Sequence, residues 1–512
     1  MLQVEHLSLI HRRDFRHLVE DVSFVLNSAD KLAIIGEEGN GKSVLLKALM
    51  QDPSILDYIE LEGTIVNSVD HFAYLPQSLE GEVLDQPLQA YFFQSLDPNE
   101  IDYGHLFQAA SQLDFSVDRL YSDQTLSSLS GGERVKVQLL RIAVQDPELV
   151  FLDEPSNDLD LRTSIWLEQW IQDFQGILVY ISHDVDLLKK TATAILHLEQ
   201  LVHKTQTRTT FKAVSYDQYL KERALNFDRQ AQVASQQQAL DKARMKDLSQ
   251  VTDKVHRSLN NTRNDVEGRL LAKKMASLKA QAKRYERDRE NFVDRPIQED
   301  AIRLGFQGVE ALPASKQVLY IDQLDLRIQE RLLAKGIHFE LYGQDKIGII
   351  GDNGVGKSTF LSYLWQSLLD KEGLRPGFMP QTYESVISDS MTPISYLQET
   401  GDQEELTQIM TYLGSMHYLP EEMQRPIHRL SGGQKAKLLV LKLDFQKANV
   451  LFLDEPTRNF SPTSQPELIE TFQAYPGAMV VVSHERSFLR QVCQKIYELT
   501  DQGLRSVDLE DI

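Results

Sequence analysis

The feature that most constrains this chain is a glycine-rich loop that occurs twice. Residues 351–359 read GDNGVGKST, and they follow the apolar run 347–350 and precede a helical pattern that begins at Phe360. A strand, a glycine-rich loop and a helix in this order form a P-loop, whose backbone N–H groups point at phosphate oxygens from a helix N-terminus. The stretch 36–43, GEEGNGKS, follows a second apolar run at 32–35. Two such loops predict two nucleotide-binding domains.

Four further motifs follow each loop in the same order. They are a short apolar run ending in Pro-Gln, an SGG stretch opening a helix, an apolar run ending in Asp-Glu-Pro, and an apolar run ending in Ser-His. The separation from Ser130 to Asp153 equals that from Ser431 to Asp454, 23 residues, and both Glu-to-His separations are 29. Equal spacings in two series indicate an internal duplication. The alternation of apolar runs with helical patterns predicts an α/β fold for each copy.

Length and composition limit the class of protein. A chain of 512 residues is too long for one core, which suggests two to four domains. Its single cysteine, Cys493, excludes a disulfide framework and a cysteine-based zinc site. No apolar run approaches the ~20 residues of a membrane helix, and the first residues lack the order of a signal peptide. We therefore expect a cytoplasmic protein.

A segment of different character separates the two copies. Residues 177–295 contain no proline and one glycine, and 219–258 are rich in good helix formers. The asparagines near 260 suit a turn, and a second helical run from Val266 to about Asn291 follows. The pattern predicts a helical hairpin whose first arm extends ~60 Å. Its sparse apolar positions predict that it projects or docks on something, since a buried core helix would be more apolar.

The hairpin segment opposes the charge of the rest of the chain. Residues 216–295 carry 18 Lys+Arg and 12 Asp+Glu, which leaves 36 and 63 of the chain's totals of 54 and 75 for the remainder. From Lys242 to Arg289 there are 14 basic and 6 acidic residues. Such a segment is suited to phosphate backbones. The bland alternative is a solvated, mixed-charge helix.

On these motifs the chain resembles the ATP-binding cassette family and, within it, the ABC-F proteins. The resemblance covers nearly the whole chain and implies an α/β fold with two P-loop ATPase domains in tandem, joined by a long α-helical hairpin linker. The implied domains are 1–214, 215–296 and 297–512. It also implies a monomeric ATPase that uses ATP and Mg²⁺, in which the two cassettes close head to tail.

The resemblance assigns roles residue by residue. Two glutamates would act as general bases and two histidines would contact the γ-phosphate and orient the water: Glu154, Glu455, His183 and His484. The nucleotide-binding residues would be Gly36, Gly39, Asn40, Gly41, Lys42, Ser43, Gln77, Ser130, Gly131, Gly132, Asp153, Gly351, Asn353, Gly354, Gly356, Lys357, Ser358, Thr359, Gln381, Ser431, Gly432, Gly433 and Asp454. Six of these would hold Mg²⁺, partly through water: Ser43, Gln77, Asp153, Ser358, Gln381 and Asp454. The adenine-stacking residue of the first copy is left open between Phe15 and His11.

Head-to-tail closure implies which motifs share a site. One site would combine the P-loop and acidic strand of the first copy with Ser431 and Gly433. The other would combine the P-loop and acidic strand of the second copy with Ser130 and Gly132.

The copies also depart from the family pattern. The first P-loop carries Glu37 and Glu38 beside a polyphosphate site. The segment 156–160, SNDLD, is close to the family D-loop, whereas 457–462, TRNFSP, lacks its Leu-Asp ending. Each D-loop of the family faces the opposite P-loop. We therefore expect unequal sites, with the Lys42 site lacking its usual D-loop aspartate.

The resemblance implies a function on the ribosome. ABC-F proteins bind the 70S ribosome when they hold ATP, place the linker in the E site beside 23S rRNA and P-site tRNA, and leave after hydrolysis. Here the contact would run through residues 242–289. The variant D-loop and the long linker favour ribosome protection against antibiotics, that is, antibiotic resistance. A general translation factor for stalled or idle ribosomes is the alternative.

Two other classes fit less well. The energy subunit of a membrane transporter has no need of a basic hairpin, so we expect no stable membrane domain. A DNA-repair ATPase of the best-known forms has zinc cysteines and a longer gap between P-loop and signature, so we expect no DNA partner.

Overall fold

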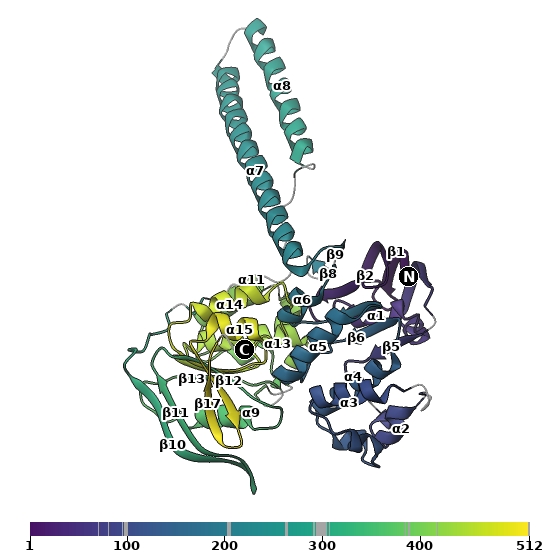
Figure 1. The fold of residues 1–512 in the computed structure, drawn as a ribbon. Helices are drawn as coiled ribbons and strands as arrows, with labels where there is room; N and C mark the ends of the chain where they lie inside the picture. Colours follow the sequence, from purple (N-terminus) through teal and green to yellow (C-terminus); the bar gives the residue numbers. More distant parts are fainter. Residues whose placement is uncertain are drawn as a thin grey trace. The chain divides into compact units, whose positions relative to one another are not determined.

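The computed structural model describes residues 1–69, 71–79, 81–94, 96, 101–201, 206–261, 265–289, 292, 305–306, 308–383, 386–387, 390–416 and 418–509. They form two compact units. One comprises Met1–Tyr216 together with Glu299–Ile512, and the other is Asp217–Gln298 (Figure 1). The larger unit contains two copies of one fold, which we call the first and second cassettes.

The first cassette is built on a six-stranded sheet of order β5-β6-β7-β3-β8-β9. The first five strands in this order are parallel, and the sixth is antiparallel to its neighbour. Their bounds are β3(Lys31–Gly36), β5(Phe72–Leu75), β6(Leu149–Asp153), β7(Ile177–Ile181), β8(Ala194–Leu201) and β9(Gln206–Lys212). A three-stranded antiparallel sheet of order β2-β1-β4 comprises β1(Leu2–His11), β2(His17–Leu26) and β4(Ile59–Asn67). The helices are α1(Lys42–Leu49), α2(Leu88–Phe93), α3(Tyr103–Gln112), α4(Gly131–Gln145), α5(Leu161–Asp173) and α6(Val185–Thr191).

The second cassette repeats the strand order as β13-β14-β15-β12-β16-β17. Its strands are β12(Lys346–Ile350), β13(Pro376–Met379), β14(Val450–Asp454), β15(Ala478–Val482), β16(Lys495–Thr500) and β17(Gly503–Val507). Within the described residues, its antiparallel sheet has two strands, β10(Gln317–Ile328) and β11(Arg331–Tyr342). Its helices are α9(Lys357–Gln366), α10(Pro393–Leu397), α11(Gln403–Ser415), α12(Pro420–Gln424), α13(Gly432–Phe445), α14(Gln465–Gln473) and α15(Arg486–Val492). Short 3-10 helices in the two cassettes lie at Pro53–Asp57, Gly81–Val83, Val117–Tyr121, Leu126–Ser128 and Ile427–Arg429. The predicted fold class, tandem P-loop α/β domains with a helical hairpin, is confirmed.

The central strands explain why the sequence shows continuous apolar runs. Every residue of β3, β6 and β7 is buried, as is every residue of β12, β14 and β15. A parallel strand covered on both faces has no solvent-facing position, so its pattern does not alternate. The carboxyl ends of parallel strands meet at one edge of the sheet. The P-loop, the Asp-Glu pair and the histidine of each copy therefore converge there.

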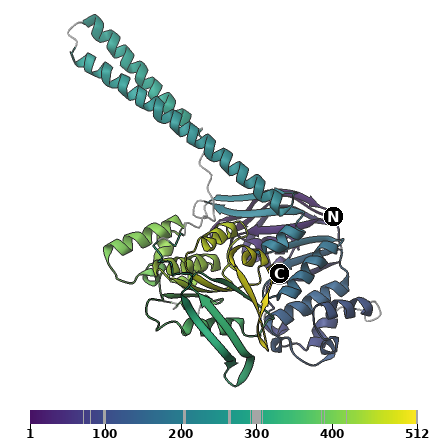
Figure 2. The same cartoon turned by 60° about the vertical axis from the view of Figure 1, so that its left-hand side comes forward.

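The smaller unit is an antiparallel helical hairpin of α7(Tyr216–Asn261) and α8(Asp265–Arg289) (Figure 2). Helix α7 begins earlier and ends later than the sequence pattern indicated, so Asn260 and Asn261 are its last residues. The turn was predicted over 259–265. Residues 259–261 instead belong to α7 and Asp265 begins α8, while 262–264 lie outside the described residues.

A narrow seam holds the two arms together. The less exposed positions of α7 recur at intervals of four and three residues, at 241, 245, 248, 252, 255 and 259. Those of α8 do the same, at 271, 275, 278, 282 and 285. This is the spacing of a coiled-coil seam. Arg289 Nε donates to Asp241 Oδ2 at 2.7 Å, and the Arg244 guanidinium lies over the Tyr285 ring. The few apolar residues of this segment are thus used within the hairpin itself.

A buried ion cluster joins the two cassettes. Glu168 of α5, 3% exposed, contacts the Arg486 guanidinium at the start of α15 and accepts from Lys190 Nζ at 2.7 Å. Ser487 N donates to Asp186 Oδ2 at 2.8 Å across the same interface. Removing one partner of a buried ion pair leaves an uncompensated charge, which is costly.

We expect Arg486→Ala to destabilise the cassette pair by ~3 kcal/mol, because Glu168 stays buried with Lys190 alone. Differential scanning calorimetry should then show the melting temperature falling by roughly 5–10 °C. Lys495→Ala is the matched control, since it removes the same charge from an exposed pair with Asp345 and should cost at most ~1 kcal/mol. Equal, small shifts in both variants would contradict the role given to the buried cluster.

Candidate nucleotide-binding sites

The first P-loop has the backbone of a phosphate cradle. Gly36, Gly39 and Gly41 have φ of 147°, 81° and 92°, in the region that favours glycine. A Cβ on Gly36 would lie 2.3 Å from Leu198 O, so no other residue fits there. Gly41 is the left-handed N-cap of α1, and no side chain caps that helix. The first-turn N–H groups of α1 are therefore suited to an anion.

A buried lysine closes each loop. Lys42 Nζ donates to Gly36 O at 2.9 Å and to Glu37 O at 3.1 Å. In the second cassette Lys357 Nζ donates to Gly351 O at 2.8 Å and to Asp352 O at 3.0 Å. Burial lowers the pKa of both lysines, and nearby carboxylates oppose it. Each ammonium group thus faces the acidic residues at the end of the neighbouring strand.

The expected serine–aspartate pairs are brought together. Burial raises the pKa of Asp153 to about 6, and a hydrogen bond with Ser43 opposes the rise. Burial likewise raises the pKa of Asp454 against a hydrogen bond with Ser358. Asp153 Oδ1 is buried and has no hydrogen-bond partner within the described residues. An oxygen of this kind beside a serine hydroxyl is a fitting ligand for Mg²⁺.

The acidic and histidine motifs meet closely in the first cassette. Glu154 Oε1 lies 3.1 Å from His183 Nε2. His183 Nδ1 lies 2.9 Å from Phe460 O in the opposite cassette, and it donates there because a carbonyl oxygen only accepts. Burial alone would raise the pKa of Glu154, but His183 and Lys42 outweigh it and leave that pKa lowered. Glu154 is therefore a carboxylate near neutral pH.

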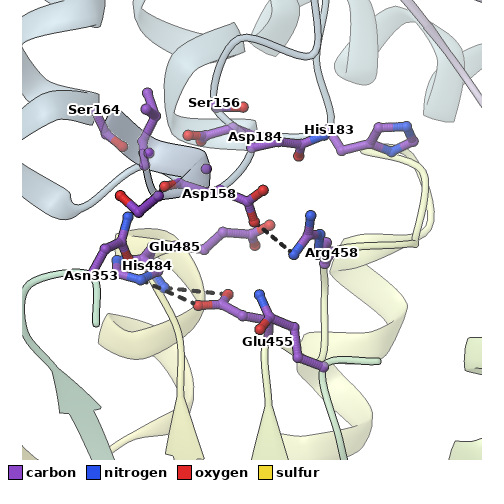
Figure 3. A pocket seen from close by; sticks show the side chains of 16 residues that line it. Ser156, Asp158, Ser164, His183, Asp184, Asn353, Glu455, Arg458, His484 and Glu485 are labelled. Carbon is purple, nitrogen blue, oxygen red and sulfur yellow. Dashed lines mark hydrogen bonds and ion pairs between the residues drawn. The ribbon is translucent and has the colours of Figure 1, made fainter. Parts of the chain in front are cut away.

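The second cassette holds the same motifs in another state. Burial and Asp454 raise the pKa of Glu455 to about 7. Burial and Lys357 lower the pKa of His484 to about 3, so its imidazole is neutral. The Glu455 Oε1–His484 Nε2 distance is 3.7 Å, and His484 Nδ1 has no hydrogen-bond partner in the described part of the chain (Figure 3). This contact is not an ion pair at neutral pH.

Each signature stretch opens a capped helix. Ser130 and Ser431 are the N-caps of α4 and α13, and each forms a capping box with the side chain three residues on. A Cβ on Gly132 would lie 2.8 Å from Asn353 Nδ2 of the second P-loop. Gly433 N donates to Glu38 Oε2 of the first P-loop at 3.0 Å. The structure thus brings each signature to the opposite P-loop, in the pairing that the resemblance implied.

The two D-loops differ as the sequence indicated. Asp160 caps α5, pairs with Lys136 at 3.1 Å, and acts electrostatically on Lys357 and His484. The matching residue of the second copy, Ser461, is 1% exposed and bonds to Ser464 of its own loop at 3.1 Å. The Lys42 site therefore has no counterpart to the Asp160 carboxylate at this position.

Two cavities lie between the cassettes. One of about 490 Å³ is lined by Lys42, Ser43, Gln77, Asp153, Glu154 and His183, with Arg458 and Asn459 from the opposite D-loop. The other, of about 270 Å³, is lined by Ser130, Gly131, Gly132, Asn353, Gln381, Glu455 and His484. Figure 3 shows Arg458 beside this second cavity, paired with Asp158. In the cavity of about 490 Å³, the glycine-rich cradle, Lys42 and the unsatisfied Asp153 oxygen fit ATP with Mg²⁺. Lys357, Ser358 and Asp454 are not among the residues that line the cavity of about 270 Å³.

The remaining candidate residues lie within the P-loops or support them. Asn40 is 1% exposed and donates from Nδ2 to Leu198 O at 3.0 Å, so its side chain props the loop from behind. Asn353 Nδ2 donates to Asp158 O of the opposite D-loop. Gly351, Gly354, Gly356, Ser358 and Thr359 lie in the second P-loop and the first turn of α9.

The larger of these two cavities is also lined by residues that the sequence motifs did not identify. Phe15 is 74% exposed on the β1–β2 turn and is neither core nor part of this cavity, whereas His11 lines it. Arg16 and Tyr58 line it too, and no motif marked them. Arg458, which lines both cavities, was visible only as a departure in the D-loop.

Comparisons with known proteins agree with this geometry. Residues 19–157 and 334–458 match the family described as ABC transporter. The chain is 28% identical to probable ATP-binding protein YheS of Escherichia coli K12, over 98% of this chain and 80% of YheS. It is 27% identical to ABC transporter F family member 5 of Arabidopsis thaliana, over 89% of this chain and 63% of that protein. A solved complex of archaeal ribosomal stalk protein aP1 with the archaeal ribosome recycling factor aABCE1 has a similar fold, with a TM-score of 0.62 at 15% identity over 98% of this chain and 89% of that one.

Glu154 and Glu455 should give different pH profiles of ATP turnover. In Glu154→Gln, turnover should rise between about pH 6 and 8, because a base with a pKa of about 7 must first lose its proton. In Glu455→Gln, turnover depends on Glu154, whose pKa is lowered, so it should stay flat over the same range. Phosphate release measured against pH in both variants tests this.

The same variants compared at one pH test the inequality of the sites. The two substitutions should reduce turnover by different factors. Equal losses with superimposable pH profiles would contradict unequal sites.

Proposed function

The chain belongs to the ATP-binding cassette family, as a member of its ABC-F group and an ATPase, and we propose that it uses ATP to bind the ribosome and hydrolysis to leave it. The observation that carries this proposal is the hairpin. Within it, 242–289 has 14 basic and 6 acidic residues in a chain of net charge −21. Its seam faces inward, and the charged side chains that the structure describes between 242 and 289 are all exposed. A basic rod on an acidic protein is suited to structured RNA, which proteins recognise through shape and phosphates.

A protein of similar fold supports the same proposal. The archaeal protein with a similar tandem arrangement is described as a ribosome recycling factor. We propose that the hairpin of this chain reaches the E site and approaches P-site tRNA, and that the contact runs through 242–289.

The proposed nucleotide cycle uses the motif residues of both cassettes. Bound ATP·Mg²⁺ would supply the phosphoanhydride whose hydrolysis drives the cycle. Lys42 and Lys357 would hold the phosphates, with the magnesium held through Ser43, Gln77 and Asp153 in one site and Ser358, Gln381 and Asp454 in the other. Glu154 and Glu455 would accept a proton from water, which His183 and His484 would orient. The signature of the opposite cassette completes each site, so binding would close the cassettes.

Two functions on the ribosome are distinguished by the second D-loop and the hairpin. The TRNFSP stretch at 457–462 and the 46-residue α7 favour protection of the ribosome against antibiotics. A general factor for stalled or idle ribosomes is the alternative. The energy subunit of a transporter is less favoured, because such a subunit has no need of a basic hairpin. Among the described residues no helix has the length and apolarity to cross a membrane.

We expect the Glu154→Gln, Glu455→Gln double variant to sediment with 70S ribosomes on a sucrose gradient. Without a base in either site it should bind ATP but not hydrolyse it, and it should therefore stay in the ATP-bound form. Deleting 242–289 should abolish co-sedimentation. Protein found in the membrane pellet instead of the ribosomal fractions would contradict ribosome binding and support a transporter subunit.

Two double variants that change the charge of α8 in opposite directions sharpen that experiment. Lys273→Glu with Lys274→Glu reverses two exposed charges, so it should weaken co-sedimentation at low salt and make the remaining binding less sensitive to salt than that of the wild-type chain. Glu267→Gln with Glu286→Gln changes exposed residues of the same helix in the opposite direction and should not weaken it. Equal effects of both pairs would show that helix disruption, and not phosphate contact, is being measured.

Expression in a susceptible bacterium separates protection from general translation. We expect the wild-type chain to raise the minimal inhibitory concentration of at least one drug that binds the peptidyl-transferase centre. The double glutamate variant should not, because protection requires release. An unchanged inhibitory concentration across that class of drugs would contradict protection and favour the general factor.

A further inference from the structure

The two P-loops differ at one position in a way that changes what they touch. Asn353 of the second loop donates to Asp158 O, in the opposite D-loop. The residue at the same place in the first loop is Glu38. Its Oε2 accepts a hydrogen bond from Gly433 N at 3.0 Å, in the first turn of the opposite signature helix α13. The first P-loop therefore reaches the signature with a carboxylate, where the second has an amide directed at the D-loop.

The fit between Glu38 and the signature is close. A Cβ on Gly432 would lie 2.2 Å from Glu38 Oε2, so a larger residue there would push the carboxylate away from its present position. The adjacent Glu37 pairs with Lys437, a residue of α13 that is 4% exposed. Both acidic residues of the first P-loop thus bind the same helix.

The chemistry of this contact is that of an anion at a helix N-terminus. Backbone N–H groups there carry partial positive charge and favour a carboxylate or a phosphate. Gly433 N is such a donor, and Glu38 supplies the anion. Glu38 itself keeps solvent exposure, so its side chain has room to swing away when another anion takes its place.

We infer that Glu38 makes the Lys42 site discriminate between nucleoside diphosphates and triphosphates. The inference rests on the proposed assignment of the Lys42 cavity to a nucleotide. A diphosphate held by the P-loop leaves the Glu38–Gly433 hydrogen bond intact. The terminal phosphate of a triphosphate must take Gly433 N from Glu38 and also lie near a displaced carboxylate. Glu38 therefore weakens triphosphate binding and leaves diphosphate binding nearly unchanged.

Binding to the full-length chain tests this. Lys357→Ala removes the second loop's lysine, so that titration with fluorescent ADP, and competition by a non-hydrolysable ATP analogue, report the Lys42 site. In this background Glu38→Gln should tighten the analogue roughly tenfold, the size expected for losing a charge-assisted hydrogen bond, and should leave ADP affinity within about twofold. Glu20→Gln is the control, because it neutralises an exposed carboxylate of β2 and leaves the contacts of Glu37 and Glu38 with α13 in place.

A second variant guards against misfolding. Glu38→Asn places the residue of the second P-loop in the first, and it should change the ratio of the two dissociation constants in the same direction. An unchanged ratio in both Glu38 variants, or equal tightening of both nucleotides, would overturn the inference. Binding of neither nucleotide in the Lys357→Ala background would instead overturn the assignment of the Lys42 cavity, and with it the inference.

Discussion

Compensation of buried charge is the interaction on which both sites depend. Lys42 and Lys357 are each 8% exposed, and each lies by two acidic residues at the end of a buried strand. An isolated buried ion is costly, whereas a lysine amid carboxylates and carbonyl oxygens is compensated. The loop must therefore curl over the end of the strand next to it, and the parallel sheet brings the two together. Compensation of the buried lysine is therefore required both for the loop to fold and for the site to bind phosphate.

Duplication reproduced the motifs but not their surroundings. Glu154 has a lowered pKa beside His183, whose other nitrogen is held by Phe460 O of the opposite cassette. Glu455 has a pKa raised to about 7 beside a neutral His484. The D-loops add to the difference, since one presents Asp160 to the opposite site and the other presents a buried Ser461. The two sites therefore contain the same motif residues in different protonation states.

Local pattern was enough to predict the elements and was not enough to predict the interface. The P-loops, buried strands and capped signature helices follow from residues close in sequence, and the hairpin followed from helix propensity. Its seam was missed because a two-stranded coil needs few apolar residues in every seven. The contact of Glu38 with Gly433 joins residues 395 apart and depends on how the cassettes meet. The sequence left the adenine-stacking residue open between Phe15 and His11, because residue type alone does not reveal which side of the β1–β2 turn faces the cavity.

One chain thus builds two unequal nucleotide sites, each from motifs of both cassettes. Rapid-mixing measurement of phosphate release from chains preloaded with ATP at both sites, in a single turnover, tests it most directly. We expect two exponential phases of equal amplitude, and only the phase of the Glu455 site should quicken as pH rises through about 7. A single exponential that releases both phosphates would contradict it.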